Sequence, residues 1–200
     1  MSELSYQSPL AGVAEPQGLS ISIREITERG MIDLRGLTTD AAFMAAVKDV
    51  LGMDLPVKPR TSASWGDVRV LWLSTDQWLI LSSRSKAHEL LTQLRDALQG
   101  IHSLVVDVSD MRAVIRLEGD GCREVIMKGT SLDLLDKEYL QGCCRRMRYA
   151  EIAALLDVVE DNVFDIYVFR SYAHYTWNFL CATAKAPAKL KLFGAQDVPA

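Results

Sequence analysis

The sequence has few of the residues that build metal and redox sites. Its 200 residues include only four cysteines and three histidines. No two cysteines have the Cys-x-x-Cys spacing of a zinc or redox site, and no histidine has a second histidine or a cysteine at ligand spacing. We therefore interpret the cysteines as reduced, partly buried thiols, with a redox switch at the adjacent pair Cys143 and Cys144 as the alternative. We interpret His88, His102 and His174 as surface or structural side chains.

The sequence also lacks the loop motifs of nucleotide-binding and hydrolytic enzymes. It has no Gly-x-Gly-x-x-Gly after a strand, no Walker sequence and no Gly-x-Ser-x-Gly elbow. The nearest glycine-rich turn is Gly-Asp-Gly at 119–121, but the Asp120 carboxylate would repel a phosphate, so we interpret it as a helix cap. Asp107 and Asp110 flank Ser109 between two predicted strands. Two such carboxylates can do acid–base work or can bond the backbone of a turn, and we prefer turn chemistry.

Long hydrophobic runs are missing as well, and so is any excess of positive charge. Hydrophobic residues make up 49% of the chain, enough for a core, but the longest apolar runs have the length of strands. The formal net charge is −4, with acidic and basic residues mixed. We therefore expect neither a nucleic-acid partner nor a membrane partner. Residues 1–17 contain no hydrophobic signal core, so the sequence predicts a cytoplasmic protein.

What the sequence does contain is an internal duplication. Residues 32–36 (Ile-Asp-Leu-Arg-Gly) and 115–119 (Ile-Arg-Leu-Glu-Gly) lie 83 positions apart, and each alternates apolar and polar residues before a glycine. Each is followed by a helix-like segment that closes on another glycine. Later in each copy, an aromatic-rich strand leads into a capped helix. Two such copies predict a pseudo-symmetric domain, because two units are too few for a repeat array.

Apolar periodicity predicts the individual elements. Alternating or continuous apolar residues predict strands at residues 21–26, 31–35, 68–73, 77–82, 104–109, 113–117, 144–149, 152–158 and 163–169. Helical spacing predicts four helices, capped in turn by Thr39 or Asp40, Ser85, Asp120 and Ser171. Residues 55–64 are expected to form a loop. Trp72, Trp78 and Phe164 are assigned mainly to the core, with a protein interface as the alternative.

The predicted fold class is α+β, a pseudo-symmetric pair of α+β halves. We divide the chain into an N-terminal arm (1–20), a first half (21–103), a second half (104–184) and a basic C-terminal tail (185–200). The arm and the tail carry apolar residues although they lie outside the repeated halves. We therefore predict subunit-interface residues in both segments, namely Pro9, Leu10, Leu190, Leu192 and Phe193.

Several segments together resemble the gamma subunit of heterotetrameric sarcosine oxidase. They are residues 8–12 (Ser-Pro-Leu-Ala-Gly), 66–79, 106–119, 128–134, and 164–171 with Trp177. The match runs in order through nearly the whole chain. That family is similar in fold to the folate-binding half of the glycine-cleavage aminomethyltransferase, so the resemblance implies an aminomethyltransferase folate-binding-like fold.

The resemblance also implies a place in an alpha-beta-gamma-delta complex. Such a complex oxidises the N-methyl group of sarcosine, giving glycine and hydrogen peroxide, and passes the one-carbon unit to tetrahydrofolate. It is expected to carry FMN, FAD or NAD, zinc and tetrahydrofolate on its other subunits, and the large alpha subunit is the expected direct partner, with beta and delta in the same complex. No catalytic, cofactor-binding or metal-binding residue is then expected in this chain.

One departure from the folate-dependent relatives supports a non-catalytic role. Those that repair iron–sulfur proteins carry a Lys-Gly-Cys-aromatic-x-Gly-Gln-Glu signature, whereas Lys128 and Gly129 are followed here by Thr-Ser-Leu. The first alternative is a gamma-like subunit of a complex that acts on another N-methyl amino acid, such as N-methylglutamate or N-methylproline. The second is a free-standing folate-binding protein.

Overall fold

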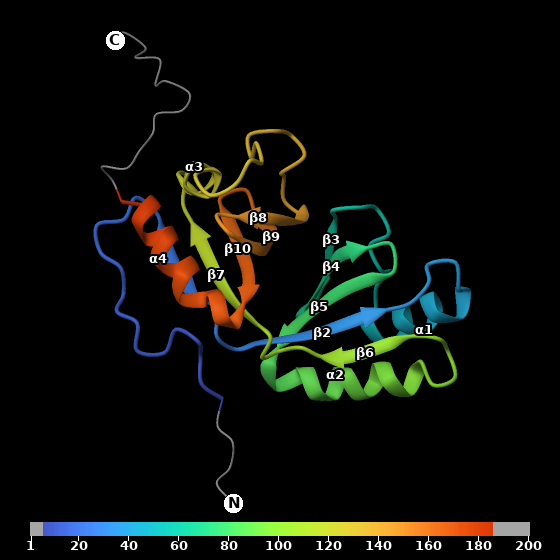
Figure 1. The fold of residues 1–200 in the computed structure, drawn as a ribbon. Coiled ribbons are helices and arrows are strands. Elements are labelled where there is room, and N and C mark those ends of the chain that lie inside the picture. The colour runs from blue at the N-terminus through green and yellow to red at the C-terminus, as the bar shows by residue number, and fades with distance from the viewer. Residues whose placement is uncertain (1–5, 186–200) are drawn as a thin grey trace, which may run out of the picture.

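The computed structural model describes residues 6–185, which form two five-stranded antiparallel sheets flanked by helices (Figure 1). The strands are β1 (Ser22–Glu25), β2 (Arg29–Arg35), β3 (Ser62–Trp65), β4 (Val68–Ser74), β5 (Gln77–Ser83), β6 (Leu104–Asp107), β7 (Arg112–Glu118), β8 (Cys144–Tyr149), β9 (Ile152–Glu160) and β10 (Val163–Phe169). The helices are α1 (Ala41–Leu51), α2 (Arg84–Ala97), α3 (Cys122–Met127) and α4 (Ala173–Thr183), with a short 3-10 helix η1 (Arg170–Tyr172) before α4. The α+β class predicted from the sequence is confirmed.

The structure contains the predicted duplication. Strands β2 and β7 each have seven residues, and they begin at Arg29 and Arg112, which are 83 positions apart. Strands β5 and β10 also have seven residues each, and each leads directly into helical structure. The two copies therefore build matching halves, the blue-to-green and the yellow-to-red parts of Figure 1.

Each half gives its first strand to the sheet of the other half. The first sheet has the order β3-β4-β5-β2-β6, and the second has the order β1-β7-β10-β9-β8. Thus β1 pairs with β7, with Ser22 opposite Glu118, and β6 pairs with β2, with Leu104 opposite Arg35. Periodicity did not reveal this exchange. The domain boundaries at 20/21 and 103/104 stay predictions. The two sheets do not divide at residue 103, because each contains one strand from the other half.

Three apolar clusters hold the layers together. One packs α1 and α2 on the outer face of the first sheet, around Phe43 and Trp78. The second packs α3, α4 and part of the arm on the outer face of the second sheet, around Phe164. The third lies between the two sheets and joins residues such as Leu71 of β4 to Tyr167 of β10. Burial of this third cluster requires both halves.

Helix α1 shows why local sequence determines some helix ends. The Asp40 side chain accepts hydrogen bonds from the N–H groups of Ala42 and Phe43, which have no partner inside the helix. Gly52 ends the helix with φ of 70°, a left-handed conformation that favours glycine. Among the described residues, no helix combines the length and the apolar character needed to span a lipid bilayer.

Three predicted caps are wrong, and one predicted loop is three residues too long. Helix α2 begins at Arg84, directly after β5, so Ser85 lies inside it. Helix α3 has Gly121 as its N-cap, and the Asp120 side chain instead accepts a hydrogen bond from Asn162. Ser171 lies within η1, ahead of α4. The predicted loop at 55–64 contains the start of β3, an edge strand that pairs with β4.

The N-terminal arm packs against the second half. Leu10 is only 5% exposed and belongs to the cluster beneath the second sheet. Ser20 donates hydrogen bonds to the carbonyl oxygen of Ala184 through both its backbone N–H and its hydroxyl. Leu10 therefore serves the core of this chain and has little surface left for a partner, whereas an interface role for the half-buried Pro9 stays a prediction. The predicted interface residues Leu190, Leu192 and Phe193 lie outside the described residues.

Candidate functional site

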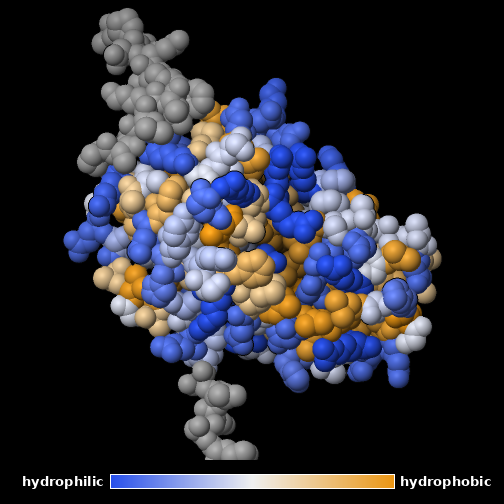
Figure 2. Space-filling view, in the orientation of Figure 1, coloured by the Kyte–Doolittle hydropathy of each residue, from blue (hydrophilic) through white to orange (hydrophobic). Residues whose placement is uncertain are grey.

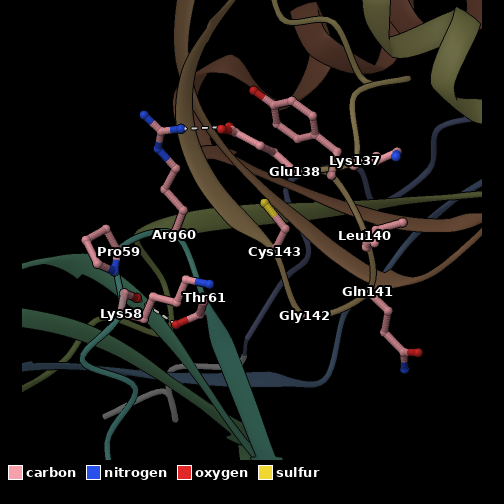
Figure 3. Close-up of a pocket in the computed structure, with 11 residues that line it drawn as sticks. Lys58, Pro59, Arg60, Thr61, Lys137, Glu138, Leu140, Gln141, Gly142 and Cys143 are labelled. Carbon is pink, nitrogen blue, oxygen red and sulfur yellow. Dashed lines mark hydrogen bonds and ion pairs between the residues drawn. The ribbon is translucent and has the colours of Figure 1, made fainter.

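A cleft of about 480 Å³ opens where the two halves meet. One wall is the segment 58–61, which precedes β3, and the other is the segment 137–143, which precedes β8. Figure 3 shows the side chains of Lys58, Arg60, Lys137 and Glu138 at this opening. Arg60 and Glu138 are 78 positions apart in the sequence, so only the tertiary fold brings the two walls together.

Main-chain hydrogen bonds between the halves form the floor of the cleft. Thr61 and Cys143 form an antiparallel bridge. On either side of it, the N–H of Ser62 donates to the carbonyl of Gly142 at 2.7 Å, and the N–H of Cys144 donates to the carbonyl of Arg60 at 2.9 Å. The seam links the edge strands β3 and β8, and it satisfies backbone groups that an edge strand would otherwise leave free.

The cleft has an excess of positive charge. Lys58, Arg60 and Lys137 face a single acidic side chain, Glu138, which pairs with Arg60 at 3.0 Å. Both members of that pair are about half exposed, at 48% and 61%, so solvent screens their attraction. The cleft can attract an anionic group. Its exposed lysines and arginine are not paired with a group that could act as a catalytic acid or base.

The thiols at and near the cleft are poor nucleophiles. Burial raises the pKa of Cys143 above its ordinary value, and it raises that of Cys144 to about 12. The Sγ–H of Cys144 donates a hydrogen bond to the carbonyl oxygen of Thr61 at 3.2 Å, within the seam. Since the thiolate is the reactive form, both side chains are inert thiols near neutral pH. This geometry favours the interpretation of the adjacent pair as buried, reduced cysteines.

The Asp107–Ser109 motif does turn chemistry. Asp107 accepts hydrogen bonds from the backbone N–H of Ser109 at 2.9 Å and from its hydroxyl at 2.6 Å. The Ser109 Oγ in turn accepts a hydrogen bond from the N–H of Met31 at 2.9 Å, which fixes the end of β6 against β2. Asp110 pairs with Arg84. Neither carboxylate is therefore placed as half of an acid–base pair.

The histidines lie apart on the surface. His88 on α2, His102 before β6 and His174 on α4 are all exposed. Within residues 6–185, no group of three or more histidine, cysteine, aspartate or glutamate side chains could hold a metal ion.

Sequence reasoning missed the buried ion pairs between the sheets. Asp157 on β9 is fully buried, and Arg69 on β4 of the other sheet binds it through two hydrogen bonds of 2.7 and 2.8 Å. Asp165 on β10 is 1% exposed and is bound by Arg116 at 2.6 and 2.8 Å, with Arg29 of the first sheet at 3.6 Å. The available signal was a lone aspartate within each of two otherwise apolar strands, because such a charge needs a partner.

Comparison of the sequence with known proteins identifies a family and a curated relative. The sequence model described as "Sarcosine oxidase, gamma subunit family" matches residues 35–186. Sarcosine oxidase subunit gamma from Corynebacterium sp. (strain U-96) is 30% identical over 167 residues, which cover 80% of this chain and 78% of that protein.

Solved structures support the fold. A chain of the heterotetrameric sarcosine oxidase from Corynebacterium sp. U-96, in complex with pyrrole 2-carboxylate, has a TM-score of 0.84 and 24% identity. The likeness covers 92% of this chain and 97% of that one. Aminomethyltransferase T of the glycine cleavage system from Bartonella henselae has a TM-score of 0.62 and 13% identity, over 82% of this chain and 46% of that one. The predicted aminomethyltransferase-like fold is therefore confirmed.

Proposed function

The chain belongs to the sarcosine oxidase gamma subunit family, and on that premise we propose that it is a non-catalytic subunit of a heterotetrameric sarcosine oxidase. In this role it binds the large alpha subunit directly and holds it in order, with beta and delta in the same complex. The relative from Corynebacterium supports the proposal, since a chain of the same fold occurs in a heterotetrameric sarcosine oxidase.

The observation that carries the non-catalytic part is how the reactive groups are used. The Cys143 and Cys144 thiols stay protonated because they are buried, and the Asp107 carboxylate is bonded to a turn. Asp157 is bound by Arg69 of the other sheet, and Asp165 is bound by Arg116 of its own sheet and approached by Arg29 of the other. These groups maintain the fold, and the chemistry is left to the other subunits.

The proposed complex demethylates sarcosine oxidatively to glycine and transfers the one-carbon unit to tetrahydrofolate. We assign FMN, FAD or NAD, zinc and tetrahydrofolate to the other subunits. A complex that acts on N-methylglutamate or N-methylproline is the alternative, because the groups that contact substrate would lie in another chain.

Three measurements on the purified full chain test this function. We expect no visible flavin absorbance, no oxidation of sarcosine, and no saturable binding of a reduced folate titrated into the chain. A stoichiometric flavin or turnover by the isolated chain would contradict the proposal. Tight binding of the folate, abolished by Arg60→Gln together with Lys58→Gln in the basic cleft, would instead favour a free-standing folate-binding protein.

A further inference from the structure

Two arginines occupy equivalent places in the duplicated halves. Arg29 is the first residue of β2, and Arg112 is the first residue of β7. Both are partly buried, and the Nε atom of each is buried without a hydrogen-bond partner. The duplication therefore allows a direct comparison of what each guanidinium faces.

Only one of the two arginines, Arg29, has a carboxylate of this chain as an ion-pair partner. Arg29 reaches Asp165, the third residue of β10, at 3.6 Å. The residue of β5 that corresponds to Asp165 in the duplication is its third residue, Leu79, which has no charge. Among the residues that the structure describes, no carboxylate lies within ion-pair distance of Arg112.

The surroundings of Arg112 do not otherwise neutralise it. Burial lowers its pKa, and the nearby positive charge of Arg146 lowers it further, whereas Asp33 acts in the opposite direction. Asp33 is already engaged, because both of its oxygens accept hydrogen bonds from the Gln77 amide, at 2.9 and 3.0 Å. The guanidinium lies 5.4 Å from the ring centre of Phe169, its cross-strand neighbour. The site therefore has a desolvated positive charge with an unmet need for an acceptor.

Apolar surface borders this charge on two sides. Phe169 is 41% exposed, and Tyr172, three residues further on, is 45% exposed. Beyond Asp33, the edge strand β6 carries Val106 opposite Asp33 in the register, and Leu104, which is 45% exposed. Figure 2 shows hydrophobic side chains gathered over β6 on this face of the molecule.

We propose that Arg112 is the anchor of the surface that binds the large subunit, and that its occupant is an aspartate or glutamate side chain of that subunit. The inference rests on the proposed function and adds to it the docking face and the chemistry of its partner. Arg112 as a whole is only partly buried, and a carboxylate can take two parallel hydrogen bonds from the terminal nitrogens of a guanidinium.

Two features favour a polypeptide as the source of this carboxylate. An arginine centre bordered by exposed aromatic and aliphatic side chains is the composition of an interface hot spot. Arg146, exposed on β8, adds a second positive charge, so the face complements an acidic segment of a partner.

Substitution of Arg112 separates a role in binding from a role in folding. Removal of an uncompensated, desolvated charge relieves a penalty, so Arg112→Met should leave the melting temperature of the full chain unchanged or raise it. Arg29→Met is the matched control, since its symmetry-related guanidinium is paired within the chain. It should lower the melting temperature.

The assembly measurement uses labelled full-length chain titrated into the large subunit purified with its other partners. Arg112→Met should weaken binding by about 30-fold or more, the usual effect of removing one partner of a buried charge pair. Arg146→Gln, which cannot unfold the chain from its exposed position, should weaken binding about 2- to 5-fold and reduce its salt dependence. Arg24→Met, on the exposed edge strand β1, should have no effect.

Failure of the inference is distinguishable from failure of the proposed function. If the wild-type chain does not bind the large subunit, the proposed function fails, and this inference fails with it. If the wild-type chain binds and Arg112→Met binds equally well, or if Arg112→Met lowers the melting temperature as Arg29→Met does, only the inference is overturned. A self-dimer abolished by Arg112→Met, or saturable binding of acetate lost in that variant with assembly intact, would assign the surface to another occupant and also overturn it.

Discussion

Asp157 and Asp165 are buried carboxylates that arginines bind at the boundary between the two sheets. Both lie within apolar strands, and both are bound by arginines, Asp157 by Arg69 across the two sheets. Such pairs contribute little net stability compared with apolar packing, but they penalise any register that separates the partners. The duplication is not exact at these positions, because both buried carboxylates lie in the second half and the first half has no counterpart.

Asp157→Asn should destabilise the chain by about 3–5 kcal/mol, because it leaves the Arg69 guanidinium uncompensated at a buried site. Chemical denaturation of the full chain measures this loss. Asp67→Asn is the control, since the Asp67–Lys86 pair is exposed on both sides and its loss should leave the denaturation midpoint unchanged. Equal stability of Asp157→Asn and wild type would show that the inter-sheet pair is dispensable.

The buried thiols predict a loss of stability in alkali. Burial raises the pKa of Cys122 and of Cys144 to about 12. An unfolded thiol ionises near pH ~8.5. Above that pH the unfolded state loses protons that the folded state retains, so stability is fully present below pH ~8.5 and falls as the pH rises toward the folded-state pKa.

At pH 10 each of these thiols should account for about 2 kcal/mol of lost stability. Unfolding curves at pH 8 and pH 10 measure the loss. Cys144→Ala should have a shallower dependence on pH than the wild type, although it is less stable at pH 8 because of the cavity it leaves. An unchanged slope in this variant would mean that Cys144 ionises normally in the folded chain.

The hairpin of β4 and β5 carries two tryptophans that differ in burial. Trp72 and Trp78 are cross-strand partners in its register. Trp78 is fully buried, and its indole N–H donates to the carbonyl of Pro56 at 2.8 Å, whereas Trp72 is half-buried between two clusters. The core assignment predicted from the sequence is therefore confirmed for Trp78 and holds in part for Trp72.

Trp78→Ala should destabilise the chain by about 3–5 kcal/mol, the usual loss on emptying a large aromatic site. Trp72→Ala should lose less, about 1–2 kcal/mol, because less of its surface is buried. Trp65→Ala, 65% exposed at the end of β3, should change stability by about 0.5 kcal/mol or less. A larger loss for Trp72 than for Trp78 would contradict this description of the hairpin.

Elements with a strong local signal could be predicted from the sequence. Alternating or continuous apolar residues located the nine predicted strands. The Asp40 cap and the Gly52 stop located α1, because the hydrogen bonds at both helix ends join residues that are close in the sequence. Strand β3 was missed because its alternating Ser-Ala-Ser-Trp sequence is only four residues long and has no Val, Ile or Leu, and pairing with β4 holds it in place. The basic cleft was missed for a similar reason: Arg60 and Glu138 become neighbours only in the folded chain.

The exchange of β1 and β6 makes the two halves depend on each other. Periodicity identifies a strand but not its partner, so the sequence could not show that each half completes the sheet of the other. Without the second half, the first sheet lacks β6, and the apolar residues between the sheets, such as Leu71 and Leu79, face water.

The fragment 21–102 should therefore show no cooperative unfolding transition. Circular dichroism during thermal and urea denaturation measures this. Co-expression of 1–102 with 103–200 as separate chains should restore a cooperative transition, since the pair contains every strand of both sheets. A stable 21–102 fragment would contradict the dependence of each half on the other.

The proposed role of this chain is that of an assembled, non-catalytic subunit. Native mass spectrometry of a complex purified through a tag on this chain, co-expressed with the other subunits, tests it most directly. We predict a particle that contains one copy of this chain with the large subunit and its partners, and that releases this chain free of flavin when the complex dissociates. Recovery of this chain without the large subunit, or release of this chain with a flavin still bound, would contradict the account.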